Sequence, residues 1–419
     1  MTETIDAPRP LAGVRVLDLS RLPAGPWSGQ LLADYGADVI KVERPGAGDD
    51  TRAWGPPWWG EGEDRVAAYF VCANRGKRSV AIDIASEAGA ARVRELAREA
   101  DVLLENYKVG QLAKYGLDCA SLRAINPGLI YCSVTGYGQD GPLAHKAGYD
   151  FAIQAEGGLM SITGEKGGEP QKVGVAVTDL MTGLYATTAV LAALHERRST
   201  GRGRHIDAAL LDVQVAMLAN QASNRLIGGR TPTRMGNAHP NIVPYQVFPT
   251  RDGQMVLAVG NDGQFARFCE LAGHAGAARD ERFATNHSRV ANRAELIPLI
   301  TSWTLQRDTQ AWVDRLDGAA VPCAPILDIQ QVLEHPHVVA RGMRLDPPTS
   351  STLRRSARRT SGLSRQASTL RAARSTSGVM RMFLDARSFI CSRITCSARL
   401  PMASMAITDA TPKRMPRDV

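Results

Sequence analysis

Long uninterrupted apolar runs are absent from this chain of 419 residues. None approaches the roughly 20 residues that a membrane-spanning helix needs. Residues 1–10 are polar and acidic, which is unlike a secretion signal. We therefore expect a cytoplasmic protein with no membrane partner. The length is enough to bury a full hydrophobic core, and it favours about two domains.

Cysteine and histidine are few and scattered. The seven cysteines include no C-x-x-C pair, and the eight histidines are dispersed along the chain. Neither set has the spacing of a zinc or iron–sulfur site. We expect no bound metal, and we expect the thiols to be buried or to have no chemical role.

Nucleotide-binding motifs are also missing. The chain has no P-loop sequence G-x-x-x-x-G-K-[ST], and its first loop offers Gly25 and Gly29 in place of G-x-G-x-x-G. Glu43 ends the second strand-like run, as an acidic residue does in NAD sites. Without the glycines that let a pyrophosphate approach the backbone, bound NAD is not expected.

The net charge of +8 is not spread over the chain. Residues 347–419 hold 14 Lys and Arg against 3 Asp and Glu, which leaves 36 basic and 39 acidic residues before them. This tail has 13 Arg, 12 Ser and no sustained helical or strand period. It reads either as a disordered basic arm or as an out-of-frame translation, and we favour the second. No nucleic-acid partner is expected.

The rest of the chain alternates between strand-like and helix-like segments. Strand-like runs occupy residues 14–19, 38–43, 78–83, 102–105 and 129–134, with helix-like stretches between them. Such alternation predicts a parallel sheet covered by helices. We expect an α/β fold: a Rossmann-like large domain at residues 1–227 and a smaller α+β domain at 228–330. Residues 331–346 would return to the large domain.

One carboxylate is placed at a helix start. Residues 173–178 form an apolar, strand-like run, and a Leu- and Ala-rich helix follows to about His195. Asp179 at this junction is suited to be a nucleophile. The plainer alternative is that Thr178 or Asp179 caps the helix and complements its dipole.

With these elements in order, the sequence resembles the class III CoA-transferases, the group that includes formyl-CoA transferase, carnitine CoA-transferase and α-methylacyl-CoA racemase. The resemblance runs from about residue 11 to 345, and residues from 347 onward lack it. The matching elements are residues 13–19, 24–26, 36–45, 77–79, 101–106, 133–138, 141–142 and the Asp179 segment.

This resemblance implies a reaction. Asp179 would attack an acyl-CoA thioester to give a mixed anhydride and CoA thiolate, and the thiolate would return to form an aspartyl-CoA thioester. The acceptor carboxylate would then attack that thioester. A covalent route of this kind divides one difficult transfer into easier steps. A loop from the small domain with Gly236, Asn237 and His239 would cover the intermediate, unless it is an ordinary interdomain turn.

Coenzyme A would be a co-substrate, with no permanently bound cofactor. By resemblance, Arg and Lys side chains near its phosphates supply bidentate contacts and point charges. The expected CoA-binding residues are Pro23, Ala24, Arg44, Lys77, Arg78, Asn106, Tyr107 and Lys114.

Tyr149 distinguishes the branches of the family. The racemase branch carries a histidine at this place, which moves a proton beside the thioester. A phenol is a much weaker proton-transfer partner than an imidazole at neutral pH. We therefore expect Tyr149 to orient the substrate by hydrogen bonding, and the reaction to be CoA transfer.

The acceptor is less defined. The segments around Tyr149, Asp179 and Gly236 look most like transferases that use succinyl-CoA and a dicarboxylic acid such as glutarate. Arg225, Arg234 or His239 could anchor the second carboxylate. The resemblance also implies an intertwined homodimer. Alternatives are a 2-methylacyl-CoA racemase, or a non-catalytic CoA-binding relic because of the tail.

Overall fold

A computed structural model describes residues 9–62 and 65–343. Its main feature is a six-stranded sheet in the order β5-β2-β1-β6-β7-β8, and every neighbouring pair is parallel. The order places the first strand in the middle, as in Rossmann folds. The strands are β1 (Arg15–Asp18), β2 (Asp38–Glu43), β5 (Arg78–Ala81), β6 (Val102–Glu105), β7 (Ile130–Thr135) and β8 (His205–Ala209). The expected α/β class is confirmed.

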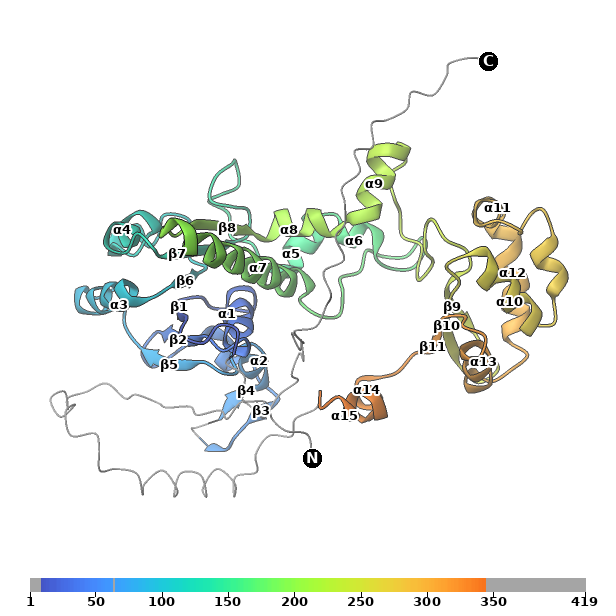
Figure 1. The fold of residues 1–419 in the computed structure, drawn as a ribbon, viewed down its shortest axis with the longest axis horizontal. Helices are drawn as coiled ribbons and strands as arrows, with labels where there is room; N and C mark the ends of the chain where they lie inside the picture. The colour runs from blue at the N-terminus through green and yellow to red at the C-terminus, as the bar shows by residue number, and fades with distance from the viewer. Residues whose placement is uncertain (1–8, 63–64, 344–419) are drawn as a thin grey trace, which may run out of the picture.

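Helices cover both faces of this sheet (Figure 1). One face packs against α1 (Ala24–Asp34) and α7 (Val177–Thr200), and the other packs against α3 (Glu87–Glu99) and α4 (Cys119–Ile125). The strands are apolar on both faces because both are buried, as parallel sheets require. The shorter elements of this unit are η1 (Asp50–Ala53), β3 (Trp58–Trp59), β4 (Val66–Ala67), α2 (Ala68–Cys72), η3 (Ala113–Tyr115), α5 (Asp150–Glu156) and α6 (Leu159–Ile162).

Helix α7 meets the length and hydropathy of a membrane span, and it is the only such helix among the described residues. Its contacts explain its composition. Ala186 and Val190 belong to the core beneath β6 and β7, and Thr187 meets Ser28 of α1 through their hydroxyls at 3.0 Å. The helix is therefore part of the core of this fold.

One expectation for this region is wrong. Residues 173–176 form no strand, and the chain enters α7 directly at Val177. After β8 the chain forms two helices separated by a break, α8 (Leu210–Met217) and α9 (Ala219–Gly228). The break falls at Ala219, whose φ of +41° cannot continue a right-handed helix.

A smaller unit follows, built on an antiparallel sheet in the order β11-β10-β9. Its core contains Phe248, Leu257, Phe265 and Trp312, all almost fully buried. The elements are β9 (Tyr245–Pro249), β10 (Gln254–Ala258), α10 (Asp262–Leu271), η4 (Ala275–Arg279), α11 (Asn286–Ala291), α12 (Arg293–Thr304), α13 (Thr309–Asp317) and β11 (Cys323–Pro325).

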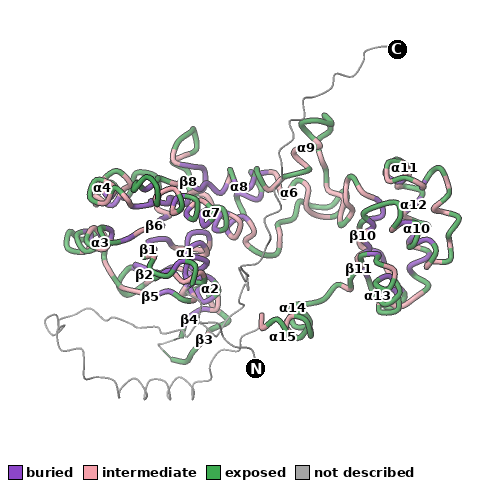
Figure 2. Tube along the Cα trace, viewed as in Figure 1, coloured by how far each residue is buried: buried purple, intermediate pink, exposed green. Residues whose placement is uncertain are grey.

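The chain leaves this unit through α14 (Ile329–Glu334) and α15 (Pro336–Ala340), which lie apart from the small sheet (Figure 1). Both helices are largely exposed, as is α9 (Figure 2). The tail at residues 347–419 lies outside the described residues.

Candidate active site

A cavity of about 740 Å³ opens at the carboxyl ends of the central strands. Its lining includes Arg21 after β1, Asn106 after β6 and Thr135 at the end of β7. The sheet changes winding direction between β1 and β6. Open α/β sheets bind ligands in the crevice at this point, because neighbouring loops diverge there.

Asp179 lies at this cavity, in the first turn of α7. Its side chain accepts no hydrogen bond from the described residues, and it is only 9% exposed. Burial, and next the charge of Asp150, raise its pKa to about 7. The site therefore holds an unpaired, partly desolvated carboxyl group beside a ligand-sized space.

The plainer reading of this segment, a capping role for Thr178 or Asp179, does not match the contacts. The N-cap residue is Ala176, with no side-chain cap. The hydroxyl group of Thr178 instead donates a hydrogen bond to the side-chain carbonyl oxygen of Gln214 in α8. The amides of Thr178 and Asp179 donate to Asp150 of α5, so a second helix supplies the cap.

Tyr149 lines the same cavity and precedes α5. Its side chain is 62% exposed, although it is a large aromatic group. Three more aromatic side chains line the cavity and are called the aromatic wall here: Trp27, Trp54 and Tyr69. Trp54 and Tyr69 meet edge to face, with their ring centroids 5.1 Å apart. The sequence does not reveal this wall, because nothing in residues 48–72 shows that they fold against the cavity.

Half of the expected CoA-binding residues line the cavity. The backbone of Arg21 and the side chain of Asn106 bind each other reciprocally, which joins the loops after β1 and β6. The guanidinium of Arg21 also lies over the ring of Tyr107, at 5.4 Å. The expected residues that the structure brings together here are Pro23, Ala24, Asn106 and Tyr107.

Lys77, expected at the phosphates of CoA, lies in the core instead. Its ammonium group donates to Asp18, to the carbonyl of Pro26 and to Asn74, at 2.7 to 2.8 Å. Burial, opposed by Asp18, lowers its pKa to about 8. Three oxygens satisfy all three donors of an ammonium group, so none is left for a ligand.

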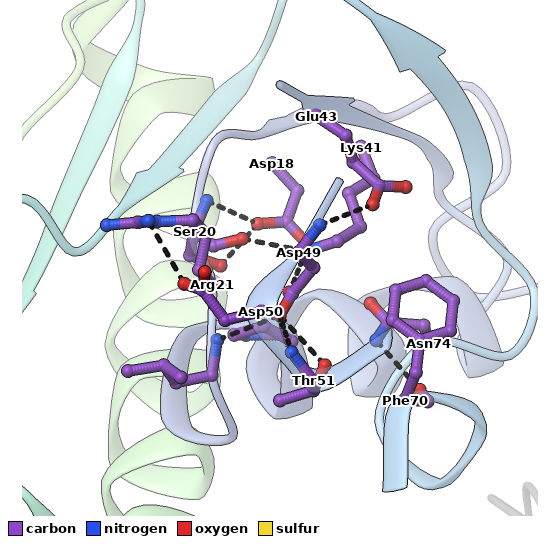
Figure 3. Close-up of polar contacts among 12 residues, drawn as sticks. Asp18, Ser20, Arg21, Lys41, Glu43, Asp49, Asp50, Thr51, Phe70 and Asn74 are labelled. Carbon is purple, nitrogen blue, oxygen red and sulfur yellow. Dashed lines mark hydrogen bonds and ion pairs between the residues drawn. The ribbon is translucent and has the colours of Figure 1, made fainter. Parts of the chain in front are cut away.

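The carboxylate of Asp18 belongs to a larger buried network (Figure 3). Ser20 donates to Asp18, and Lys41 pairs with Asp49 at 2.9 Å. The amide of Asp49 donates in turn to Glu43. This network fixes the ends of β1 and β2 beneath the cavity.

Arg78, also expected at the phosphates of CoA, does not lie near the cavity. It begins β5, pairs with Asp38 at the start of β2, and so lies at the amino end of the sheet, opposite the cavity. Arg44 and Lys114 lie outside the cavity lining, but both lie at the carboxyl end of the sheet, as the cavity does. Arg44 is 3.7 Å from Asp50, which also binds Arg21, and Lys114 lies over the ring of Tyr115.

Lysines outside the expected CoA-binding set also line the cavity. Lys146 pairs with Glu156, whereas no described carboxylate pairs with Lys108 or Lys172. Lys108 follows Tyr107 in the loop after β6, a position that adjacency to the expected residues could have suggested. Lys172 lies in the segment that leads into α7.

The loop with Gly236, Asn237 and His239 is not part of the lining. The amide of Gly236 donates to the carbonyl of Gly164, and His239 packs beside Tyr245 at 5.3 Å. The loop thus connects the small unit to residues 164–165 of the large one. No group of side chains suited to a metal ion occurs within residues 9–62 and 65–343.

Fold and cavity together define an α/β protein whose ligand site lies at the switch point of a doubly wound parallel sheet. Comparison with known sequences then specifies the family. Residues 11–372 match the model of CoA-transferase family III, so the chain belongs to this family and is a CoA-transferase. The match extends beyond residue 346, so the expectation that the resemblance ends near 345 is wrong.

Named relatives support the same assignment. The chain is 54% identical to the succinate–glutarate CoA-transferase of Agrobacterium fabrum, over 83% of this chain and 87% of the relative. It is 45% identical to the human succinyl-CoA:glutarate CoA-transferase, over 81% and 77%. A crystal structure of a CAIB/BAIF family protein from Brucella suis matches with a TM-score of 0.73 and 53% identity, over 81% and 90%.

Proposed function

We propose that this enzyme transfers CoA from succinyl-CoA to a small dicarboxylic acid such as glutarate, with Asp179 as the nucleophile. The observation that carries the proposal is the unpaired, buried carboxyl group of Asp179 at the cavity. The printed activities of the bacterial and human relatives support the choice of substrates.

The reaction starts at the thioester. A carboxylate oxygen of Asp179 attacks the carbonyl carbon, the C–S bond breaks, and CoA leaves as the thiolate. The thiolate then attacks the aspartyl carbonyl of the anhydride, which releases succinate and leaves an aspartyl-CoA thioester. The acceptor carboxylate attacks that thioester and expels the CoA thiolate, which leaves a second anhydride. The thiolate then attacks the acceptor's carbonyl carbon, which gives the acceptor's CoA thioester and frees the carboxylate of Asp179. Each step exchanges one acyl–oxygen or acyl–sulfur bond for another, so the acyl group stays activated.

The cavity fits CoA as a substrate. Pro23 and Ala24 after β1 line the space, as do Asn106 and Tyr107 after β6. Arg21, Lys108 and Arg44 bring positive charge to this end of the sheet, which suits phosphate groups. We assign Lys114 to the outer part of the same surface.

Tyr149 is assigned to orienting the acyl group, because its exposed ring faces the cavity without an acidic or basic partner. The racemase alternative would need a base at this position.

Water must be kept from the anhydride, since hydrolysis is the competing reaction. The aromatic wall of Trp27, Trp54 and Tyr69 excludes it from one side. We propose that the loop with Gly236, Asn237 and His239 covers the open side of the cavity, and that formation of a homodimer brings this loop over the site.

A homodimer is supported by apolar side chains that are far more exposed than in a self-sufficient monomer. Leu226 and Ile227 of α9 are 84% and 89% exposed, and Ile329 of α14 is 81% exposed. Light scattering of the purified protein tests this part, and a monomeric mass would contradict it. We place the enzyme in the cytoplasm.

The test of the proposed function is a pair of measurements on Asp179→Asn. Transfer from succinyl-CoA to glutarate should be abolished, while CoA binding by calorimetry should be retained. Loss of a covalent nucleophile removes the pathway itself. In the wild type, hydroxylamine added with succinyl-CoA should leave a hydroxamate on Asp179. Transfer that survives in the Asn variant would refute the proposal.

A further inference from the structure

Two carboxyl groups meet at the start of α7. Oδ1 of Asp150 accepts the amides of Thr178 and Asp179, at 2.8 and 3.2 Å. These amides are among the donors that the first turn of a helix leaves without intrahelical partners. Asp150 stands 29 residues before Asp179 and belongs to a different helix, α5.

The carboxylate of Asp150 is held from its other side as well. Gln154, one turn later in α5, donates to Oδ2 at 2.6 Å. The carbonyl oxygen of the same Gln154 side chain accepts the amide of Val173, at 2.9 Å. Asp150 and Gln154 therefore fasten both ends of the segment 173–179 that carries the nucleophile to the cavity.

We propose that Asp150 is a positioning residue for acyl transfer: it fixes the first turn of α7 and places a negative charge beside Asp179 that is relieved when Asp179 is acylated. This inference rests on the proposed function, since it needs Asp179 as nucleophile.

The charge matters because it acts differently before and after the covalent step. Ionised Asp179 is repelled by Asp150, but the anhydride and the aspartyl thioester carry no charge at that position. The repulsion is thus present in the free enzyme and lost in the intermediates, which favours acylation. It also makes the carboxylate more basic, in agreement with the raised pKa of Asp179.

The surrounding groups leave Asp150 as the main charge next to Asp179. Tyr69 of α2 faces both carboxylates, and Cys72 of the same helix lines the cavity. Burial raises the pKa of each of them, so both are neutral near pH 7. From the other cavity walls come His145, Lys146 and Lys172, of which Lys146 is paired with Glu156.

Asp150→Asn removes the charge and keeps one oxygen that accepts from the two backbone amides. Its NH2 group replaces Oδ2 and so loses the hydrogen bond from Gln154, a loss that Gln154→Leu reproduces with the charge kept. We expect the acid limb of kcat/KM, which reports ionisation of Asp179, to move down by about half to one pH unit. The yield of hydroxamate on Asp179 should fall by about tenfold or more, because acylation no longer relieves repulsion. Asp150→Ala should lose activity further, since both amides lose their acceptor.

Asp118→Asn is the matched control. Asp118 caps α4 by accepting the amide of Ser121 at 3.1 Å, away from the cavity, so its pH profile should equal that of the wild type. Gln154→Leu is a second variant that keeps the charge. It should lower kcat with the acid limb unmoved.

The outcomes are distinguishable. If the wild type transfers CoA but Asp150→Asn has the pH profile and hydroxamate yield of Asp118→Asn, the inference is wrong and the proposed function stands. If Gln154→Leu keeps full kcat, the hydrogen bonds from Gln154 to Asp150 and Val173 do not position Asp179 for the reaction. If the wild type forms no hydroxamate on Asp179, the proposed function itself fails.

Discussion

Gly183 of α7 packs directly on Ala24 of α1: a Cβ atom at Gly183 would lie 2.8 Å from the carbonyl oxygen of Ala24. Gly183 follows Asp179 by one helical turn, and Ala24 lines the cavity. The absence of a side chain at Gly183 lets the start of α7 approach the start of α1. This contact therefore brings Asp179 close to the loop after β1.

Gly183→Ala should destabilise the protein by about 1–3 kcal/mol, because the new methyl group overlaps backbone that cannot move aside freely. It should also lower kcat, since α7 shifts relative to the cavity. Urea unfolding and steady-state kinetics measure the two effects. Gly263→Ala in α10 is the control, because its Cβ would meet only ordinary contacts beyond 3.4 Å. It should be neutral or stabilising by about 0.5–1 kcal/mol. Equal behaviour of the two variants would contradict the packing argument.

Asp179→Asn should stabilise the fold at high pH. The pKa of Asp179 is about 7 in the folded protein against a usual value near 4, so the folded state holds this proton more tightly. Its contribution to stability is complete below about pH 4 and is lost as the pH rises through 7. The Asn variant lacks this dependence. Its unfolding free energy should match the wild type at pH 4 and exceed it at pH 8 by about 2–4 kcal/mol.

The control for that comparison is Glu196→Gln on the exposed part of α7, where Glu196 pairs with Arg204 at the surface. This exchange should leave the free energy of unfolding nearly unchanged at either pH, because solvent screens an exposed pair. A pH-independent difference between Asp179→Asn and the wild type would show that Asp179 is not desolvated in the folded protein.

Tyr149→Phe should lower transfer only moderately, by about tenfold or less, because it removes the proposed hydrogen bond to the substrate and leaves Asp179, the proposed nucleophile, intact. Neither this variant nor the wild type should exchange the α-proton of a 2-methylacyl-CoA in deuterium oxide, as no histidine base stands at this position. Mass spectrometry of the recovered thioester measures the exchange. Rapid deuterium uptake by the wild type would support the racemase alternative.

Lys77→Met should unfold the protein or destabilise it by about 3–5 kcal/mol, because Asp18 would remain charged and buried without its main partner. Arg78→Gln removes an exposed pair with Asp38 and should cost less than about 1 kcal/mol. Neither change should act through the phosphates of CoA. If Lys77→Met were stable and weakened CoA binding, Lys77 would be a ligand residue after all.

The sequence by itself determined the alternation of strands and helices, and with it the α/β class. Parallel strands with both faces buried must be short and apolar, and their carboxyl ends must meet at one edge. Pro23, Ala24, Asn106 and Tyr107, which the resemblance to class III CoA-transferases assigned to CoA, follow two such strands and share one cavity.

Only the tertiary structure decided which charged residues face that cavity. Lys77 and Arg78 are adjacent in sequence, yet one is buried on Asp18 and the other lies at the far end of the sheet. The aromatic wall and the Asp150 contact also depend on segments that are distant in sequence. A local pattern fixes periodicity and backbone preference, whereas the direction of a charged side chain depends on what the rest of the fold packs around it.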